Sequence, residues 1–250
     1  MNIVLFSAEE ISRPPFIGAL SLRDERGRHI LKILRKKSGD TFGAGIIDGP
    51  IGTAVIEEIS GDAIRFRFIP ERESPPLYPV CLLVGFPRPI QLKRLLRDAA
   101  SLGVSGIRLM GTELGEKSYM DSTLVERGGA YTSLLEGTVQ SGTTKVPALE
   151  LYRSVEECLA SVTGPNMKLV MDNVRPRFSL SQDICKEAGA DSGASPVYLA
   201  VGSERGWTDR ERELFAAEGF LSCGLGGRIL RTETAVTAAV SILLGRMGLM

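Results

Sequence analysis

Two glycine-rich loops close to the end of the chain carry the residue types best suited to chemistry. Residues 202–206 and 224–227 each follow a short apolar, strand-like run, and each is followed by a helical pattern. Glycine has no Cβ, so these loops allow a ligand to approach the backbone closely. Backbone amides at the start of a helix also bind anions and hydrogen-bonding heterocycles. Side by side, two such loops would hold one ligand between them.

The spacing of glycines in these loops does not identify the ligand, but it argues against several classes of binding site. The dinucleotide fingerprint G-x-G-x-x-G fails because Ile229 stands where its third glycine would be. The chain has no G-x-x-x-x-G-K-[ST] phosphate loop. In G-S-E-R-G, residues 202–206, a glutamate occupies the position where a nucleophile elbow requires serine. Taken alone, either loop is more often a plain turn than a binding site.

The elements that position the loops follow from the pattern around them. Residues 197–201 are β-branched and aromatic and predict a buried strand, and residues 220–223 predict another. Thr208, with Glu211 three residues later, predicts a capping box at the start of a helix over residues 209–218.

From residue 80 onward, strand and helix patterns alternate. Strands are expected at residues 80–85, 107–110, 148–152 and 168–172, and helices at 90–102, 124–139, 154–162 and from about 234 to 247. This rhythm predicts an α/β fold with a mostly parallel sheet covered by helices. The last helix has an apolar face broad enough for a core contact and also for a two-fold interface.

Residues 1–72 have the pattern of a small β-barrel, with short strands expected at 2–6, 41–47, 52–59 and 63–69. Between the first two lies a basic segment, residues 23–37, with seven basic and two acidic side chains. Ile30, Leu31, Ile33 and Leu34 fit one helical face there, which leaves a basic stripe outward. Such a stripe is most often only solvated. The small-barrel context favours an RNA contact instead, because clustered positive charge binds phosphates.

Composition limits the remaining possibilities. Proline-rich residues 73–79 predict a linker between domains 1–72 and 80–250. The 30 basic and 30 acidic side chains balance, so any nucleic-acid surface must be local. Four scattered cysteines without C-x-x-C predict buried thiols in a reducing compartment and no metal site. The start of the chain lacks a charged leader and no apolar run is long enough for a membrane span, so we expect a cytoplasmic protein without a membrane partner.

Two separate motifs make the chain recognisable. V-G-S-E-R-G-W-T, residues 201–208, and L-G-G-R-I-L-R-T-E-T-A, residues 225–235, together resemble the C-terminal signature of RsmE-type ribosomal RNA methyltransferases of the SPOUT superfamily. H-I-L-K-I-L-R, residues 29–35, is similar to the motif of that family's N-terminal PUA-like barrel. The first signature departs from the usual G-P-E-G-G, because Ser203 and Arg205 replace a proline and a glycine.

The resemblance implies a C-terminal SPOUT α/β domain with a deep trefoil knot, a small N-terminal PUA-like β-barrel, and a homodimer built around the knot. Connection rules alone favour an unknotted sheet. It also implies S-adenosyl-L-methionine as cofactor, held mainly by backbone groups of three loops. The implied cofactor-binding residues are Met171, Asp172, Val201, Gly202, Ser203, Glu204, Gly206, Leu225, Gly226, Ile229 and Leu230.

The implied reaction is methylation of a uridine at N(3) in 16S rRNA, within the small ribosomal subunit. That atom lies on the Watson–Crick edge and carries a proton, so the base must be unpaired and the proton must leave. Arg205 and Arg231 are candidates to stabilise the uridine anion or a phosphate, and Glu204 and Glu233 to accept the proton; capping or ion pairing would explain each equally well. Candidate RNA-binding residues are Arg28, His29, Lys32, Arg35, Lys36 and Lys93.

Two other classes of protein remain open at this point. A non-catalytic RNA-binding protein is favoured only by the altered G-S-E-R-G loop, and a nucleotide-binding oxidoreductase lacks the third glycine of its fingerprint. The methyltransferase is preferred because two motifs, in two domains and in the right order, agree.

Overall fold

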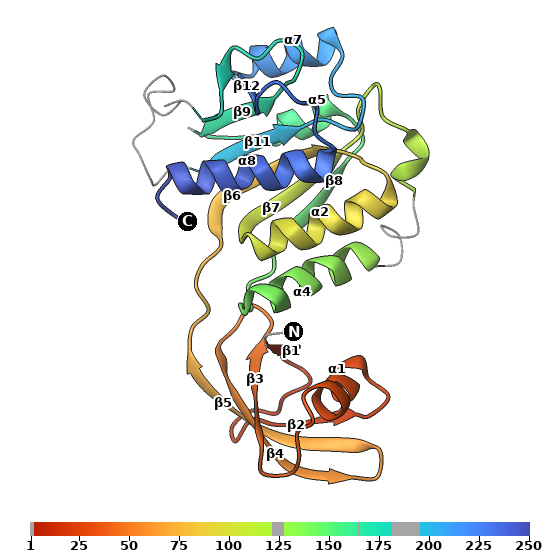
Figure 1. The fold of residues 1–250 in the computed structure, drawn as a ribbon, viewed down its shortest axis with the longest axis vertical. Helices are drawn as coiled ribbons and strands as arrows, with labels where there is room; N and C mark the ends of the chain where they lie inside the picture. Colours follow the sequence, from red (N-terminus) through yellow and green to blue (C-terminus); the bar gives the residue numbers. More distant parts are fainter. Residues whose placement is uncertain (1–2, 122–127, 165, 182–195) are drawn as a thin grey trace. The chain divides into compact units, whose positions relative to one another are not determined.

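A computed structural model describes residues 3–121, 128–164, 166–181 and 196–250, which fall into two compact units. The first comprises Met1–Pro76 together with Thr138–Val146, and the second Leu77–Gly137 together with Pro147–Met250. The colours of Figure 1 follow the chain from the first unit (red and orange) into the second (yellow to blue). A short segment from the middle of the sequence is therefore built into the N-terminal unit.

The first unit contains a five-stranded sheet in the order β1-β3-β4-β5-β2. Its strands are β1 Val4–Phe6, β2 Ile17–Ser21, β3 Thr41–Ile46, β4 Ile51–Ser60 and β5 Ala63–Arg72. The four strands expected from the sequence all form, while β2 was not foreseen. Gly18 interrupts the apolar alternation of β2 because a Cβ there would lie 2.3 Å from the ring of Phe66. The close packing of Phe66 therefore requires a glycine at position 18, and this glycine hides the strand pattern from sequence analysis.

The basic segment 23–37 adopts a different helix from the one expected. Residues Glu25–Arg28 form α1, and His29–Ile33 continue as a π-helix, η1, in which the amide of Leu34 donates to the carbonyl of His29. The wider turn changes the spacing of side chains. Ile30 is fully buried, but Ile33 is 68% exposed. The expectation of a single apolar face is therefore wrong.

Residues Thr138–Val146 are held in the first unit by hydrogen bonds to its loops. The Thr144 side chain is fully buried; its hydroxyl donates to the carbonyl of Gly49 (2.5 Å), and its amide donates to Oγ of Ser74 (3.1 Å). The Lys145 ammonium donates to the carbonyl of Asp48 (2.6 Å). These contacts explain why this segment belongs to the first unit although its sequence neighbours belong to the second.

The second unit is built on a seven-stranded sheet in the order β10-β12-β9-β11-β6-β7-β8, and every described strand pair in it is parallel. Its strands are β6 Tyr78–Gly85, β7 Val104–Met110, β8 Ala148–Tyr152, β9 Met167–Met171, β10 Phe178–Ser179, β11 Val197–Val201 and β12 Leu221–Gly224. The expected parallel sheet is confirmed, with β11 at its predicted bounds. The two-residue β10 was not foreseen.

Helices α2 Pro89–Ser101, α5 Val155–Ala160, α7 Asp209–Ala217 and α8 Thr232–Arg246 contact strands of this sheet. Helix α4, Gly129–Ser141, packs against α2 instead, since a Cβ on its Gly137 would lie 2.2 Å from the carbonyl oxygen of Arg97. A 3-10 turn, η2, spans Lys117–Tyr119. In Figure 1, α2 and α8 lie against each other, and α5 contacts α7. The capping box predicted at Thr208 and Glu211 forms. Part of the helix expected at 124–139 lies outside the described residues.

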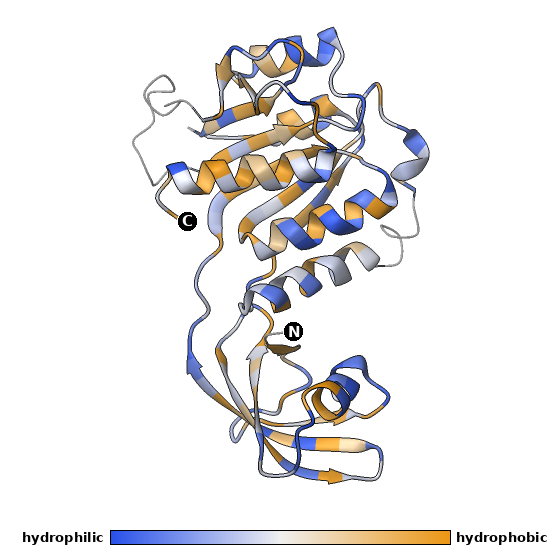
Figure 2. Ribbon diagram, in the orientation of Figure 1, coloured by the Kyte–Doolittle hydropathy of each residue, from blue (hydrophilic) through white to orange (hydrophobic). Residues whose placement is uncertain are grey.

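Apolar side chains gather between these layers. Figure 2 shows the strands of this sheet mainly in the hydrophobic colours and α7 largely in the hydrophilic ones. On one side of the sheet, the indole of Trp207 packs edge-on against Phe215, which packs in turn against Phe220. This aromatic cluster lies directly beneath the loop that follows β11, so the core supports the site described next.

Candidate active site

A cavity of about 320 Å³ lies at the carboxyl ends of β9, β11 and β12. Ligands of open parallel sheets bind at this edge. Its walls are the loops that follow these three strands and the start of α8. All eleven residues that the resemblance assigns to the cofactor line it: Met171, Asp172, Val201, Gly202, Ser203, Glu204, Gly206, Leu225, Gly226, Ile229 and Leu230.

The loop after β9 is fixed by Asp172, whose side chain is only 4% exposed. Its carboxylate accepts hydrogen bonds from the amides of Val174 (3.0 Å) and Arg175 (3.3 Å), and from Nε of Arg212 (2.9 Å). Burial opposes ionisation of this group, but the Arg212 guanidinium and the two amides outweigh it and lower the pKa of the carboxyl. The cavity-lining carboxylate of Asp172 is thus held by an ion pair with Arg212.

The loop after β11 needs its glycines. A Cβ on Gly202 would lie 3.0 Å from Cα of Gly206, and Gly206 has a positive φ of 70°. The turn is closed by the amide of Gly206, which donates to the carbonyl of Ser203 (2.9 Å). Oγ1 of Thr232, in the first turn of α8, donates to the carbonyl of Gly202 (3.4 Å). The loop and the last helix are therefore joined.

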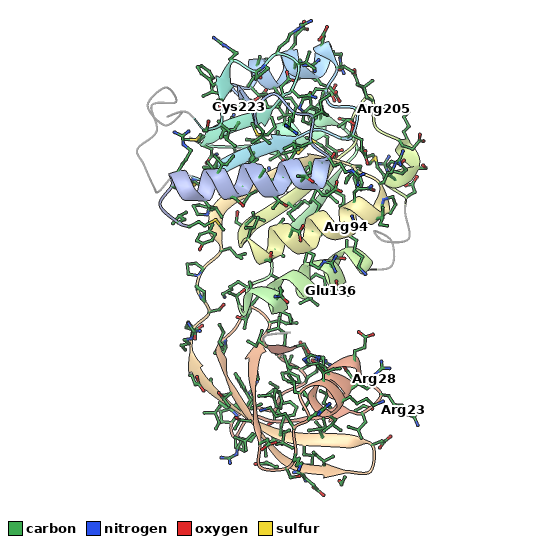
Figure 3. The ribbon with its side chains drawn as sticks, in the orientation of Figure 1. Arg23, Arg28, Arg94, Glu136, Arg205 and Cys223 are labelled. Atoms are coloured by element: carbon green, nitrogen blue, oxygen red, sulfur yellow. The ribbon has the colours of Figure 1, made fainter. Side chains whose placement is uncertain are left out.

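The two residues that depart from the family signature contact the same neighbouring loop. Oγ1 of Thr112 donates to Oγ of buried Ser203 (3.2 Å), and Nη1 of Arg205 donates to the carbonyl of Leu114 (3.4 Å). Neither hydrogen bond is available to a proline and a glycine. Figure 3 labels Arg205 in the second unit. Arg205 lines the cavity, as well as being a predicted catalytic candidate.

The two candidate proton acceptors have different surroundings. Oε1 of Glu204 accepts a hydrogen bond from the amide of Arg88 (2.8 Å), the residue that caps the N-terminus of α2. Glu233 lies in the first turn of α8 and is only 8% exposed. Its Oε2 is buried and has no hydrogen-bond partner within the described residues. Glu204 therefore anchors a loop, whereas Glu233 has a buried carboxylate oxygen without a protein partner among the described residues.

The remaining predicted residues lie outside the cavity. Arg231 is exposed and caps the N-terminus of α8, and neither it nor Glu233 lines the cavity. Sequence reasoning did not assign six other lining residues to the site. They are Asn173, Val174, Cys223, Arg228, Thr232 and Ala235. Most of them fall inside the matched signature or directly after β9, which was the available signal.

The candidate RNA-binding residues of the first unit lie on α1 and η1 and just after them. Arg28, Lys32 and Arg35 are exposed, and Figure 3 labels Arg28 on this segment. Burial lowers the pKa of His29, and its Nε2 has no hydrogen-bond partner among the described residues. Lys93 is on α2 of the second unit, 4.0 Å from Glu136. The structure therefore distributes the six candidates over both units.

The cysteines that the structure describes are free thiols. Burial raises the pKa of Cys81 to about 11, of Cys158 to about 12 and of Cys223 to about 11. Cys158 and Cys223 are buried as expected, Cys81 is partly exposed, and Cys185 lies outside the described residues. Within the described ranges, no helix has the length and apolar character to cross a membrane.

Comparison with known families agrees with both units. The family described as RNA methyltransferase domain matches residues 73–244, and the one described as RNA methyltransferase PUA domain matches residues 22–69. These matches define an RNA methyltransferase that carries an N-terminal PUA domain.

Individual relatives narrow this class. The chain is 41% identical over 250 residues to ribosomal RNA small subunit methyltransferase E of Treponema pallidum, with 98% of this chain and 91% of that protein covered. It is 29% identical over 239 residues to ribosomal RNA small subunit methyltransferase E 1 of Borreliella burgdorferi, with 96% and 95% covered. The chain belongs to the ribosomal RNA small subunit methyltransferase E family.

Solved structures share the fold. The methyltransferase E of Neisseria gonorrhoeae bound to S-adenosyl methionine superimposes with a TM-score of 0.78 at 21% identity, covering 97% of each chain. A methyltransferase of Legionella pneumophila with bound cofactor SAM also gives 0.78, at 23% identity, covering 98% of this chain and 97% of that one. The resemblance stated from the sequence is confirmed, and the oxidoreductase and non-catalytic alternatives are set aside.

Proposed function

We propose that this chain transfers the methyl group of S-adenosyl-L-methionine to N(3) of a uridine in 16S rRNA. One observation carries the proposal. The sequence resemblance assigns eleven residues at the ends of three strands to the cofactor, and all eleven line one cavity. Support comes from the relatives, which are named as ribosomal RNA small subunit methyltransferases, and from two similar structures that hold the cofactor.

The residues of the cavity suit this cofactor. At Gly226 and Gly227 a Cβ would meet no atom within 4 Å, so the backbone edge of residues 225–230 is open to a ligand. Ile229 is 83% exposed and offers an apolar surface beside it. We assign the adenine to backbone groups of this loop, and the remaining contacts to the loops after β9 and β11. Bound there, the cofactor supplies an electrophilic methyl group.

The C-terminal segment is proposed to form the trefoil knot, and the protein to act as a homodimer. The strand order supports the first point, since β9 lies between β12 and β11 and the loops after all three meet in one cavity. Exposed apolar side chains support the second, because Ile229 and Val174 both line that cavity and both remain largely open to solvent. A two-fold partner would cover such a surface.

Residues 1–72 are proposed as the PUA-like RNA-binding domain, residues 73–79 as a linker and residues 80–250 as the catalytic domain. The match to the PUA family supports an RNA role for the basic segment. Its candidates are Arg28, His29, Lys32, Arg35 and Lys36, and Lys93 would extend the surface on α2. We further propose that the substrate is the small ribosomal subunit and that the reaction takes place in the cytoplasm.

Proton removal from uridine N(3) is assigned to Glu233. Its buried Oε2 lacks a partner among the described residues, and its helix also contributes Thr232 and Ala235 to the cavity wall. Glu233 does not line the cavity, so its side chain would have to turn towards it before an N–H of the target base could reach that oxygen. Glu204 is assigned to positioning, because its carboxylate already holds the amide of Arg88. Exposed Arg205 and Arg231 would stabilise the uridine anion or a flanking phosphate.

The decisive experiment supplies the purified protein with labelled S-adenosyl-L-methionine and small ribosomal subunits that lack the modification. Nucleoside mass spectrometry then identifies the product. Label recovered as 3-methyluridine is the expected result, and cofactor binding without transfer would point to a different RNA substrate. Absence of both binding and transfer would contradict the proposal.

A pair of isosteric variants tests the two acidic residues. Glu233→Gln is expected to lower kcat about 100-fold, a usual loss for a general base, with the Kd for S-adenosyl-L-methionine little changed. Glu204→Gln keeps an oxygen that accepts from the Arg88 amide, and so is expected to keep most of its activity. The reverse pattern would transfer the proton-accepting role to Glu204.

A further inference from the structure

A second and larger cavity, of about 660 Å³, lies in the same unit at the carboxyl ends of β6, β7 and β8. Phe86 follows β6, Thr112 follows β7 and Arg153 follows β8, so loops after three adjacent parallel strands enclose it. This is the ligand-binding edge of an open parallel sheet. The volume is within the range of about 300–1,000 Å³ found for ligand pockets. The proposed function leaves this cavity without a ligand.

The charges on its wall argue against a phosphate. Its described lining residues include five carboxylates, Glu113, Glu116, Asp121, Glu156 and Glu211, against the three cations Lys117, Arg153 and Arg210. A cavity with more negative than positive charge repels a phosphate. It suits a ligand that donates N–H groups to carboxylate oxygens instead.

Several of these carboxylates already have partners. Arg210 pairs with Glu113 (2.5 Å) and with Glu156, and Glu211 accepts hydrogen bonds from the amides of Glu113 (2.9 Å) and Thr208 (2.8 Å). Glu116 and Asp121 differ, because both are exposed and neither has an ion pair among the described residues. Glu116 accepts only a long hydrogen bond from the hydroxyl of Ser118 (3.5 Å). Of the two, Glu116 is nearer in sequence to Thr112 and Leu114, which contact the cofactor loop, so we take it as the acceptor.

The wall also has an apolar part, to which Phe86, Met120 and Val155 contribute. Apolar surface next to a carboxylate acceptor is the combination that recognises a nucleobase with an exocyclic amino group. The planar ring is covered by apolar side chains, and the amino group donates to the carboxylate. Adenine, cytosine and guanine carry such a group, whereas uracil does not.

This cavity shares a wall with the cofactor cavity. Thr112, which lines it, donates to Ser203, and the carbonyl of Leu114, in the same loop, accepts from Arg205. Ser203 and Arg205 line the cofactor cavity. A ligand in the second cavity is therefore separated from the cofactor by one hydrogen-bonded loop. That separation suits a neighbour of the methylated nucleotide and not the methylated base itself.

We infer that this second cavity binds the amino-bearing base of a nucleotide adjacent to the target uridine, with Glu116 accepting from its amino group. The inference rests on the proposed function, because it requires an RNA substrate in the cofactor cavity. The base must leave its stack to enter, as in other enzymes that act on unpaired nucleotides. Sequence context around the target would then be recognised by the loop after β7.

The test compares Glu116→Ala with a matched control, Glu213→Ala. Glu213 is an exposed carboxylate on α7 that does not line the cavity. Alanine removes the acceptor altogether, so Glu116→Ala is expected to raise the KM for small ribosomal subunits about tenfold, as for the loss of one hydrogen bond to a charged acceptor. The control is expected to stay within about twofold of the wild type, as surface substitutions usually do. The Kd for S-adenosyl-L-methionine is expected to be unchanged in both.

A second arm locates the base. Small subunits are reconstituted with 16S rRNA in which each neighbour of the target in turn carries an analogue lacking the exocyclic amino group. One analogue is expected to raise the KM of the wild type to the Glu116→Ala level and to leave that variant unaffected. Met120→Trp, which fills the rim of the cavity, is expected to raise the KM as well.

The outcomes separate the two proposals. Failure of the wild type to form 3-methyluridine would overturn the proposed function and this inference with it. If the wild type forms it while Glu116→Ala and Met120→Trp both keep the wild-type KM, only the second-cavity inference is overturned. Analogue effects that add to the Glu116→Ala effect at every position would overturn it in the same way.

Discussion

Replacing Asp172 by asparagine is expected to destabilise the second unit by about 2 kcal/mol, because a buried charge-assisted pair is broken. The Asp172 side chain is 4% exposed and that of Arg212 19% exposed. Two hydrogen bonds join them, from Nε (2.9 Å) and from Nη2 (3.3 Å). Arg212 also keeps a hydrogen bond to Asp209 (3.0 Å) in the variant. The cost is therefore expected to fall below the roughly 3–5 kcal/mol that breaking a buried pair costs.

The fluorescence of the single tryptophan of the chain can be used to follow unfolding of the second unit. Trp207 is buried, and its indole Nε1 donates to the carbonyl of Met171 (2.9 Å), the residue before Asp172. Urea unfolding followed by Trp207 fluorescence measures the free energy of unfolding of the second unit. Because residues 172–174 line the cofactor cavity, calorimetry is also expected to show weaker S-adenosyl-L-methionine binding in Asp172→Asn.

A double-mutant cycle that combines Asp172→Asn with Arg212→Met measures the interaction between these two side chains. The coupling free energy is expected to be about 1–3 kcal/mol, the range for residues in direct contact. The pKa of Asp172 is lowered in the folded state, so its contribution is complete above the unfolded pKa, near 4, and is lost as the pH falls through the folded value. The stability difference from Asp172→Asn should therefore shrink below pH 4. A coupling energy near zero at pH 7, or a difference that persists unchanged to the lowest pH, would refute this account.

Three further outcomes are expected from other parts of the chain. Thr144→Val should destabilise the first unit by about 1–2 kcal/mol in far-UV circular dichroism melts, because the partly buried carbonyl of Gly49 loses its donor; an unchanged melt would show that the Thr144 hydrogen bond is not needed there. The double variant Lys32→Ala/Arg35→Ala should reduce the slope of log K for RNA binding against log salt by roughly 1.5; an unchanged slope would remove the basic segment from the RNA surface. The NMR titration of His29 should have a midpoint below 6.5, because burial disfavours the charged ring, so its contribution to stability is complete above pH 6.5 and is lost as the pH falls through the folded value. A midpoint above 6.5 would contradict the burial of His29.

Elements specified by local sequence could be predicted. Strand β11 forms at its expected bounds, and the Thr208 and Glu211 capping box forms as expected. Both signals depend on residues within a few positions of one another, so a single sequence contains them. The residues of the cofactor cavity were expected from the family resemblance and not from local pattern. The parallel sheet explains why the loops after β9, β11 and β12 meet, because these strands end at one edge.

Features that depend on distant residues could not be predicted. Strand β2 needs Gly18 to make room for Phe66, and only the packed sheet shows why. The place of the 138–146 segment in the first unit depends on Thr144 meeting Ser74 and Gly49, which are 70 and 95 residues away. No periodicity in either segment encodes such a pairing. The π-turn at 29–33 belongs to the same class, because a helical pattern does not distinguish a π-turn from an α-turn.

The G-S-E-R-G loop shows how a departure from a family pattern is accommodated. A proline stiffens a turn by restricting the unfolded chain, and the serine here does not. In this chain the loop is held from outside, by the hydrogen bonds that join Ser203 to Thr112 and Arg205 to Leu114. The sequence shows the departure but not the compensation, since both partners are 91 residues away. Two hydrogen bonds therefore fix the loop in place of a stiff proline. Both bonds go to the loop after β7, which also lines the second cavity.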